Sequence, residues 1–138
     1  MQDKKLYTLS TLITVAGCKY HAHGRKAFGD AINCKMGEPS WDTRRFRLEK
    51  EPENVYNPLA VAVYFDNYKL GYIPDDRLAE QTSAIEDIEE FVESTGNTLN
   101  WLYTVDHVSW DGDRVVWAKL LATTDVWLTD AEVATLND

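Results

Sequence analysis

The middle of the chain alternates apolar and polar residues with a period of two, which is typical of β-strands. Phe46 and Leu48 alternate with charged residues and predict one strand. The β-prone run Leu59–Phe65 predicts a second strand, and Lys69–Ile73 predicts a third. Asp66-Asn67, between the last two runs, is a turn signal. This segment therefore predicts three strands, the first two separated by a long polar break and the last two by a tight turn.

A helix follows, because Pro74-Asp75-Asp76 ends the third strand and the apolar residues then recur at helical spacing. Ser83 and Glu86 form a capping-box pattern, which predicts that the helix restarts near Thr82 after a short first turn. Gly96-Asn97 is a typical C-terminal stop. The sequence predicts one main helix over about residues 75–95, with an apolar face of Leu78, Ile85, Ile88, Phe91 and Val92.

Residues 6–20 predict a first strand, in which Gly17 marks a bulge or the close approach of another backbone. Alternation along this strand places Lys19 and His21 on one face. Residues 24–44 form a long polar insert, which in a compact domain is usually functional or ordered by a small helix. A weak apolar cluster at helical spacing predicts such a helix and consists of Ala27, Phe28, Ala31, Ile32 and Met36.

The C-terminal third predicts a β-hairpin over about residues 99–122, because Asp111-Gly112 lies between two β-prone runs. Residues 126–128 predict a further short strand, and Thr129–Glu132 a helical turn. Most of the tryptophans lie in this hairpin, where we expect them to fill the core. The whole pattern predicts an α+β fold, namely a small antiparallel, OB/SH3-like β-barrel with one main α-helix, formed as a single domain by residues 1–138.

Composition agrees with one soluble domain: 138 residues, of which 44% are hydrophobic, suffice for a core of their own. No apolar run approaches the roughly 20 residues that span a bilayer, and the N-terminal sequence is not that of a signal peptide. We therefore expect a cytoplasmic protein without a membrane partner. Cys18 and Cys34 are too few for a disulfide framework and are expected to be reduced, partly buried thiols.

The net charge of −9 hides an uneven distribution. Residues 1–50 carry 10 Lys and Arg against 5 Asp and Glu, whereas residues 51–138 carry 4 against 18. The acidic total argues against general affinity for nucleic acid. A local basic face beside an acidic one remains compatible with a bound phosphate, because the local field decides that contact.

Candidate catalytic and metal-binding patterns are weak. Cys18, His21, His23 and Cys34 do not have the spacing of a standard zinc site, so we expect no metal. The chain contains no G-x-S-x-G, Walker A or G-x-G-x-x-G motif, and we expect neither a cofactor nor enzymatic activity. Tyr20, Tyr56 and Tyr72 differ from the other aromatic residues, because they lie at predicted strand ends and turns, where a base or flat ligand could stack. Core or rim packing is the alternative role for them.

Three separated segments resemble the HIRAN domain family: VAGCKYH at Val15–His21, LEKEPENVYNPLAVAV at Leu48–Val63 and KLGYIP at Lys69–Pro74. The similarity extends over about residues 13–80. It implies a modified OB-like barrel that binds single-stranded DNA and captures its free 3′-hydroxyl end. The family also occurs fused to helicases and as stand-alone domains.

Carried over position by position, the resemblance assigns Lys19 to a phosphate, Tyr20 and the adjacent His21 to a base, and Tyr72 to the wall of the pocket. It makes Asn54, Tyr56 and Asn57 the loop that binds the end. The chain departs from the family where Asn57 replaces the usual Asp, where Asp75 replaces a basic residue, and in the insert 24–44. Basic residues that could extend the phosphate path are Arg25, Lys26, Lys35, Arg44 and Arg45.

Two other functions stay open. The domain could have kept the fold and lost the nucleic-acid site, so that its acidic surface docks a basic protein or another copy of the chain. It could also serve a helicase or nuclease that is encoded separately. The sequence leaves the choice between DNA and RNA, and the oligomeric state, undetermined.

Overall fold

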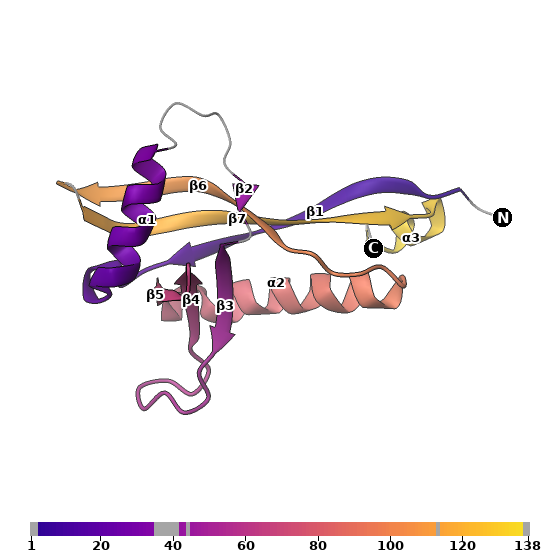
Figure 1. The fold of residues 1–138 in the computed structure, drawn as a ribbon. Coiled ribbons are helices and arrows are strands. Elements are labelled where there is room, and N and C mark those ends of the chain that lie inside the picture. Colours follow the sequence, from indigo (N-terminus) through magenta and orange to yellow (C-terminus); the bar gives the residue numbers. More distant parts are fainter. Residues whose placement is uncertain (1–2, 35–41, 44, 113, 137–138) are drawn as a thin grey trace.

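The computed structural model describes residues 3–34, 42–43, 45–112 and 114–136. Two antiparallel sheets and three α-helices form an α+β arrangement in the described residues, as the sequence predicts (Figure 1). In order, the elements are β1 (Lys5–Val15), a 3₁₀ helix η1 (Cys18–Tyr20), α1 (Ala22–Cys34), β2 (Asp42–Thr43), β3 (Phe46–Lys50), β4 (Val61–Phe65), β5 (Tyr68–Tyr72), α2 (Asp75–Ser94), β6 (Leu102–Asp111), β7 (Arg114–Leu128) and α3 (Asp130–Leu136).

The larger sheet has the strand order β1-β7-β6-β2 and is antiparallel throughout. The predicted C-terminal hairpin is confirmed as β6 and β7, which turn at Gly112 with φ of 64°. The separate short strand expected at residues 126–128 is wrong, because β7 runs unbroken to Leu128. Residues 118–128 of β7 pair with the whole of β1, from Val15 opposite Ala118 to Lys5 opposite Leu128.

The smaller sheet has the order β3-β4-β5, as predicted for the middle of the chain. Asp66 and Asn67 both have positive φ, 51° and 68°, so the turn between β4 and β5 is of the primed type that matches the strand twist. Among the described residues the two sheets do not close into one barrel. They meet at a single bridge between Ala16 and Tyr72.

The segment after β1 corrects the predicted strand over residues 6–20. β1 ends at Val15, Gly17 takes a left-handed conformation with φ of 77°, and η1 and α1 follow directly. Lys19 and His21 are therefore not on one face of a strand. The short helix predicted in the insert is confirmed as α1, and its Phe28 is fully buried against Phe46 and Phe65, with ring centroids 5.5 and 5.4 Å away.

Helix α2 lies along the two sheets in Figure 1 and is continuous from Asp75, so the predicted restart near Thr82 is wrong. The Thr82 hydroxyl donates to the Leu78 carbonyl one turn back instead of capping a new helix. The helix ends before Gly96, whose φ of 77° is the expected left-handed stop. Its buried side chains are Leu78, Gln81, Ile85 and Val92.

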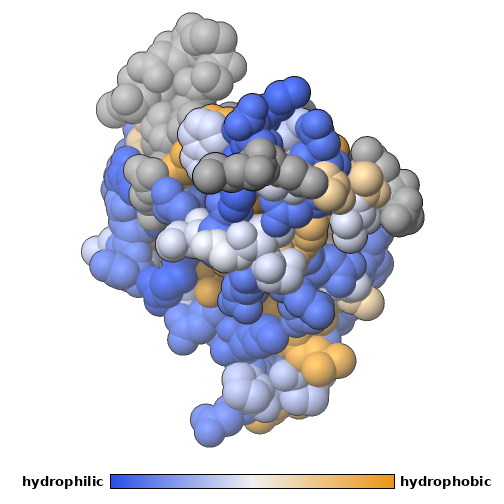
Figure 2. All heavy atoms as spheres, turned by 90° about the vertical axis from the view of Figure 1, so that its right-hand side faces the viewer, coloured by the Kyte–Doolittle hydropathy of each residue, from blue (hydrophilic) through white to orange (hydrophobic). Residues whose placement is uncertain are grey.

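Most core side chains belong to one cluster, which both sheets share with α1 and α2, and a smaller cluster around Val92, Val126 and Leu128 continues it toward the far end of α2. The expectation that the tryptophans of the C-terminal third fill this core holds only for the half-buried Trp101, which packs against the main cluster. It is wrong for Trp110 and Trp127, which are exposed. At the end of the molecule that carries α3, hydrophilic residues dominate the surface, and apolar ones show only in small, separate areas (Figure 2). In the part of the chain that the structure describes, the helices are too short or too polar to cross a bilayer.

The contact between α1 and β5 gives a test of the packing. A Cβ atom at Gly24 would overlap the backbone of Lys69 and Leu70, so Gly24→Ala should lower the free energy of unfolding by about 1–3 kcal/mol. In the same helix a Cβ at Gly29 would meet Trp110 and Val115 at 3.9 Å, an ordinary contact. Gly29→Ala should therefore stabilise the protein by up to about 1 kcal/mol through helix propensity. Urea denaturation measures both; equal effects of the two substitutions would contradict the packing.

Candidate functional site

A groove of about 670 Å³ lies where three separated segments of the chain meet. The first segment is the turn after β1, the second is the loop between β3 and β4, and the third is the junction of β5 with α2. It contains six of the seven residues predicted to bind nucleic acid; Lys19 lies beside it. We call it the tyrosine groove; it is lined by Ala16, Gly17, Tyr20, His21, Glu53, Asn54, Val55, Tyr56, Asn57, Ala60, Tyr72, Ile73, Pro74 and Asp75.

The first and third segments are joined by the bridge between the two sheets. The Ala16 N–H donates to the Tyr72 carbonyl at 2.8 Å, and the Tyr72 N–H donates to the Ala16 carbonyl at 2.9 Å. Gly71 makes this approach possible, because a Cβ there would overlap the Ala16 carbonyl oxygen. The bridge therefore sets η1, and with it Tyr20 and His21, next to Tyr72.

The second segment is shaped by two asparagines. The Asn54 Oδ1 accepts the N–H groups of Tyr56 and Asn57 at 2.9 and 3.1 Å. The Asn57 Oδ1 accepts the N–H of Leu59 at 2.9 Å, and its Nδ2 donates to the Asp75 carboxylate at 3.1 Å. These are Asx-type contacts that fix a loop conformation. Both predicted ligand-binding asparagines thus also hold the loop, and Asn57 ties it to the start of α2.

The loop and η1 present aromatic and apolar side chains to solvent. Tyr20 is 76% exposed, Tyr56 95% and Val55 89%. The Tyr72 ring is half-buried and lies 5.8 Å from the His21 ring, with an angle of 55° between the ring planes. Large apolar groups held in the open in this way usually mark a binding surface.

A charge network beneath the groove was not predicted from the sequence. The half-buried Glu51 and Lys69 form an ion pair at 2.6 Å. The Tyr72 hydroxyl donates to Glu51 at 2.7 Å and accepts from Lys69 at 2.8 Å, and Asn54 donates to Glu51 at 3.1 Å. The network fixes the Tyr72 ring and the base of the loop. Sequence offered no signal for it beyond the presence of these residues in two of the motifs, because their contact depends on where the loop returns across the sheet.

The network changes the acid–base properties of the site. The hydrogen bond from Lys69 is the main cause that lowers the pKa of Glu51 to about 2, and the carboxylate in turn raises the pKa of Lys69. Burial, together with the nearby Lys69 charge, lowers the pKa of His21, while Glu51 acts in the opposite direction. His21 therefore enters the site as a neutral imidazole at neutral pH, able both to donate and to accept a hydrogen bond.

The charged residues that line the tyrosine groove are acidic. Glu53 and Asp75 lie in it, and none of its described lining residues is Lys or Arg. Two of the predicted cations lie beside the groove, next to η1. The Lys19 Nζ lies 5.0 Å from the centroid of the Tyr20 ring, and Arg25 donates to the Lys19 carbonyl at 3.4 Å.

The remaining predicted phosphate contacts are placed less favourably. Lys26 pairs with Asp30 at 2.9 Å, on the exposed side of α1. Arg45 pairs with Asp66 at the β4–β5 turn and stacks over Phe65 at 4.6 Å, so it does not line the groove. Lys35 and Arg44 lie outside the described residues.

Metal and thiol chemistry find little support here. Among the described residues no group of three or more His, Cys, Asp and Glu side chains is arranged to hold a metal ion. Cys18 is a free, fully buried thiol, and burial raises its pKa to about 12, so it is not a thiolate at neutral pH. The side chain of Cys34 is outside the described part of the chain.

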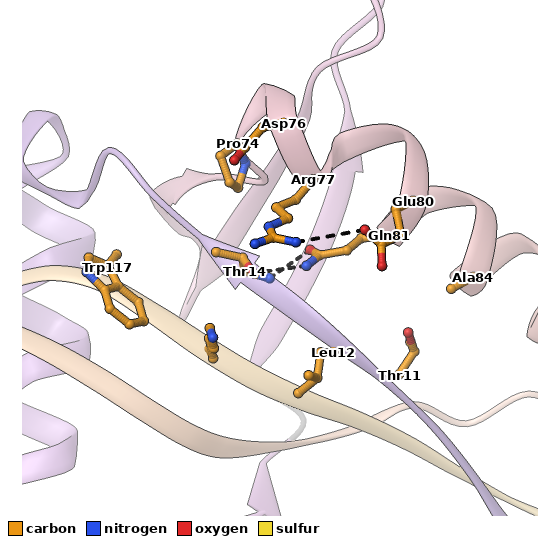
Figure 3. A pocket seen from close by; sticks show the side chains of 11 residues that line it. Thr11, Leu12, Thr14, Pro74, Asp76, Arg77, Glu80, Gln81, Ala84 and Trp117 are labelled. Atoms are coloured by element: carbon orange, nitrogen blue, oxygen red, sulfur yellow. Dashed lines mark hydrogen bonds and ion pairs between the residues drawn. The ribbon is translucent and has the colours of Figure 1, made fainter.

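A second groove, of about 550 Å³, opens between α2, β1 and β7, and we call it the Trp117 groove (Figure 3). Pro74 lines both grooves. The buried Gln81 amide joins α2 to β1 at the base of the Trp117 groove, accepting the Thr14 N–H at 2.8 Å and donating to the Thr14 hydroxyl at 2.9 Å. Figure 3 shows Arg77 reaching from α2 toward this point.

Comparisons with known proteins give two similar structures and no family. No family model matches the chain, and no curated protein does. A crystal structure of a protein from Lactobacillus plantarum is 16% identical, with a TM-score of 0.47 over 87% of this chain and 99% of its own. The crystal structure of the HIRAN domain of human HLTF is 14% identical, with a TM-score of 0.48 over 97% of this chain and 87% of its own.

The second of these structures belongs to the family that the three sequence motifs resemble. Identities and scores this low carry no argument about what the present chain does.

The network under the groove predicts a specific pH dependence. Because the pKa of Glu51 falls from its ordinary value of 4.5 to about 2 in the folded state, its stabilising contribution is complete above pH 4.5 and is lost as the pH falls toward 2. At neutral pH, Glu51→Gln should lower the free energy of unfolding by about 1–2 kcal/mol, a figure reduced for partial exposure. Urea denaturation should show the gap between wild type and variant narrowing from pH 4.5 downward. A gap that stays constant, or one that the exposed neighbour Glu53→Gln reproduces, would contradict the role of the network.

Proposed function

We propose that the tyrosine groove binds the free 3′-hydroxyl end of a single-stranded nucleic acid, with DNA as the main ligand. We further propose that the domain acts by binding and not by catalysis. The observation that supports this most directly is the meeting of two exposed tyrosine rings with the Asp75 carboxylate in one groove. A strand end presents flat base faces and a hydroxyl group, and these side chains match both.

The rings provide the affinity. Tyr20 and Tyr56 stand largely in solvent, so that a base can stack on either without displacing a core side chain. Stacking on an aromatic side chain contributes about 1–3 kcal/mol per base and is tolerant of sequence. The Tyr72 ring is held in place by its hydroxyl contacts and forms a fixed wall next to them.

The carboxylate provides the preference for a hydroxyl. One oxygen of Asp75 accepts a hydrogen bond from Asn57, and an ionised carboxylate has further lone pairs for a 3′-hydroxyl donor. A 3′-phosphate would instead bring negative charge next to Asp75 and Glu53. The acidic lining, unfavourable for phosphate, is thus suited to an end that lacks one.

The phosphate nearest the strand end would meet cations at the rim of the groove. Lys19 lies over the ring of Tyr20, and Arg25 contacts the Lys19 carbonyl, so both charges border the entrance on the side of η1. Such contacts make binding fall with salt. The local arrangement makes binding compatible with the net charge of −9.

Fluorescence anisotropy with short oligonucleotides tests the proposal. A single strand with a 3′-hydroxyl should bind more tightly than the same strand with a 3′-phosphate, by about tenfold for one charge-assisted hydrogen bond of about 1.5 kcal/mol. Asp75→Asn should abolish most of that preference, because a neutral amide does not repel the phosphate. Equal and negligible binding of both oligonucleotides would reject the proposal.

Tyrosine variants test the stacking surface separately. Tyr20→Ala should weaken binding of the 3′-hydroxyl strand about tenfold, because one base loses its ring. Tyr68→Ala is the matched control, since Tyr68 is a half-exposed tyrosine that stacks on His23 and does not line the groove. If both variants weaken binding alike, the rings of the groove are not the stacking surface.

The same loop favours one alternative function. The loop between β3 and β4 exposes three large apolar side chains, Val55, Tyr56 and Leu59, of which Leu59 is 75% exposed. Hydrogen bonds within the loop fix its conformation, and the acids Glu53 and Asp75 lie nearby. A basic protein with an apolar cavity would fit this arrangement, and a separately encoded helicase or nuclease is one class of such partner. A pull-down that is resistant to nuclease, unchanged by Tyr20→Ala and lost with Val55→Asp would favour this alternative over the strand end.

A further inference from the structure

The Trp117 groove combines an aromatic ring with two cations from different elements. Trp117 and Lys119 belong to β7, and the Lys119 Nζ lies 5.8 Å from the centroid of the Trp117 ring. Arg77 reaches into the groove from α2, and Figure 3 shows its guanidinium between Pro74 and Thr14. An aromatic ring and cations in one groove are a combination that recurs where single strands bind.

The two cations are accessible. Arg77 pairs with Glu80 at 3.9 Å, which is longer than a hydrogen bond, and the Arg77 side chain is more than half exposed. Lys119 is also exposed. Asp76 and Glu80 line the groove as well, so its lining is balanced in charge, whereas the described lining of the tyrosine groove has two acids and no cation.

This difference matters for a bound strand. Each nucleotide beyond the terminal one adds a phosphate, and among the described residues that line the tyrosine groove there is no Lys or Arg to contact it. Two places next to that groove do, namely Lys19 with Arg25 and Arg77 with Lys119. The ring beside Lys19 is Tyr20, which already belongs to the tyrosine groove, whereas the second place adds a ring of its own, Trp117. The second place also shares Pro74 with the tyrosine groove.

We propose, on the basis of the function proposed above, that a strand whose 3′ end lies in the tyrosine groove continues across Pro74 into the Trp117 groove. There a base stacks on Trp117, and Arg77 and Lys119 contact the backbone phosphates. The two grooves then form one binding path, with the hydroxyl end in the first and the preceding nucleotides in the second.

Length-dependent binding tests this path. Oligothymidylates of about three and about ten nucleotides with 3′-hydroxyl ends are titrated against wild type and against the double variant Arg77→Ala/Lys119→Ala. Wild type should bind the longer strand at least about tenfold more tightly. The double variant should lose that gain, and its plot of log K against log salt should become shallower by about 1.4, or about 0.7 for each phosphate. Trp117→Phe keeps an aromatic ring and should retain the gain, whereas Trp117→Ala should lose it.

Control variants separate the possible failures. Lys5→Ala/Arg114→Ala removes the same two charges from exposed positions outside both grooves and should leave the length dependence unchanged. If the double variant of the Trp117 groove keeps the gain, or if Lys19→Ala/Arg25→Ala alone removes it, the path is wrong while binding of the short strand still supports the function of the tyrosine groove. If no oligonucleotide of either length binds wild type, both proposals fall. Unchanged affinity for the short strand shows that a variant has kept its fold.

Discussion

Two backbone hydrogen bonds between Ala16 and Tyr72 are the constraint on which the site depends. They join the end of the long strand β1 to the end of β5 and are the one bridge between the two sheets in the described part of the chain. Gly71 permits the close approach, and the left-handed Gly17 then turns the chain into η1, so that Tyr20 and His21 face the loop between β3 and β4. The bridge fixes the first and third segments of the groove next to each other. The hydrogen bond from Asn57 to Asp75 and the Glu51, Lys69 and Tyr72 network hold the loop between β3 and β4 in place beside them.

Local pattern was sufficient to predict the elements whose signal lies within a few residues. The Asp66-Asn67 turn, the Asp111-Gly112 hairpin and the helix that ends at Gly96 depend on positive φ or on turn chemistry, and the structure has them where the sequence places them. Six of the seven expected site residues also come together, because the motifs that carry them end strands that the fold brings side by side. The failures lie where tertiary contacts decide. β1 stops at Val15 because the backbone turns at Gly17, and β7 continues to Leu128 because β1 offers a partner along its whole length.

Side-chain environments were less predictable than elements. Trp110 and Trp127 are exposed although tryptophan usually fills cores. Trp127 takes the face of β7 opposite the buried Val126 and Leu128. The pairing of Glu51 with Lys69 depends on the path of the loop, which no spacing in the sequence reveals. The charge of the groove likewise depends on which side chains the fold turns toward it. The basic N-terminal third supplies Lys19 and Arg25 at the rim, whereas the acidic remainder of the chain supplies Glu53 and Asp75 in the lining.

The burial of Cys18 has a practical consequence. Its thiol lies in η1, directly after the left-handed glycine, and it has no contact with solvent. A buried thiol resists alkylation as long as the turn after β1 keeps its folded conformation. The rate at which Cys18 is alkylated therefore reports how often this segment of the tyrosine groove unfolds locally. A ligand that bridges this turn and the neighbouring loop would slow the modification, which gives occupancy of the groove a chemical readout without any label on the ligand.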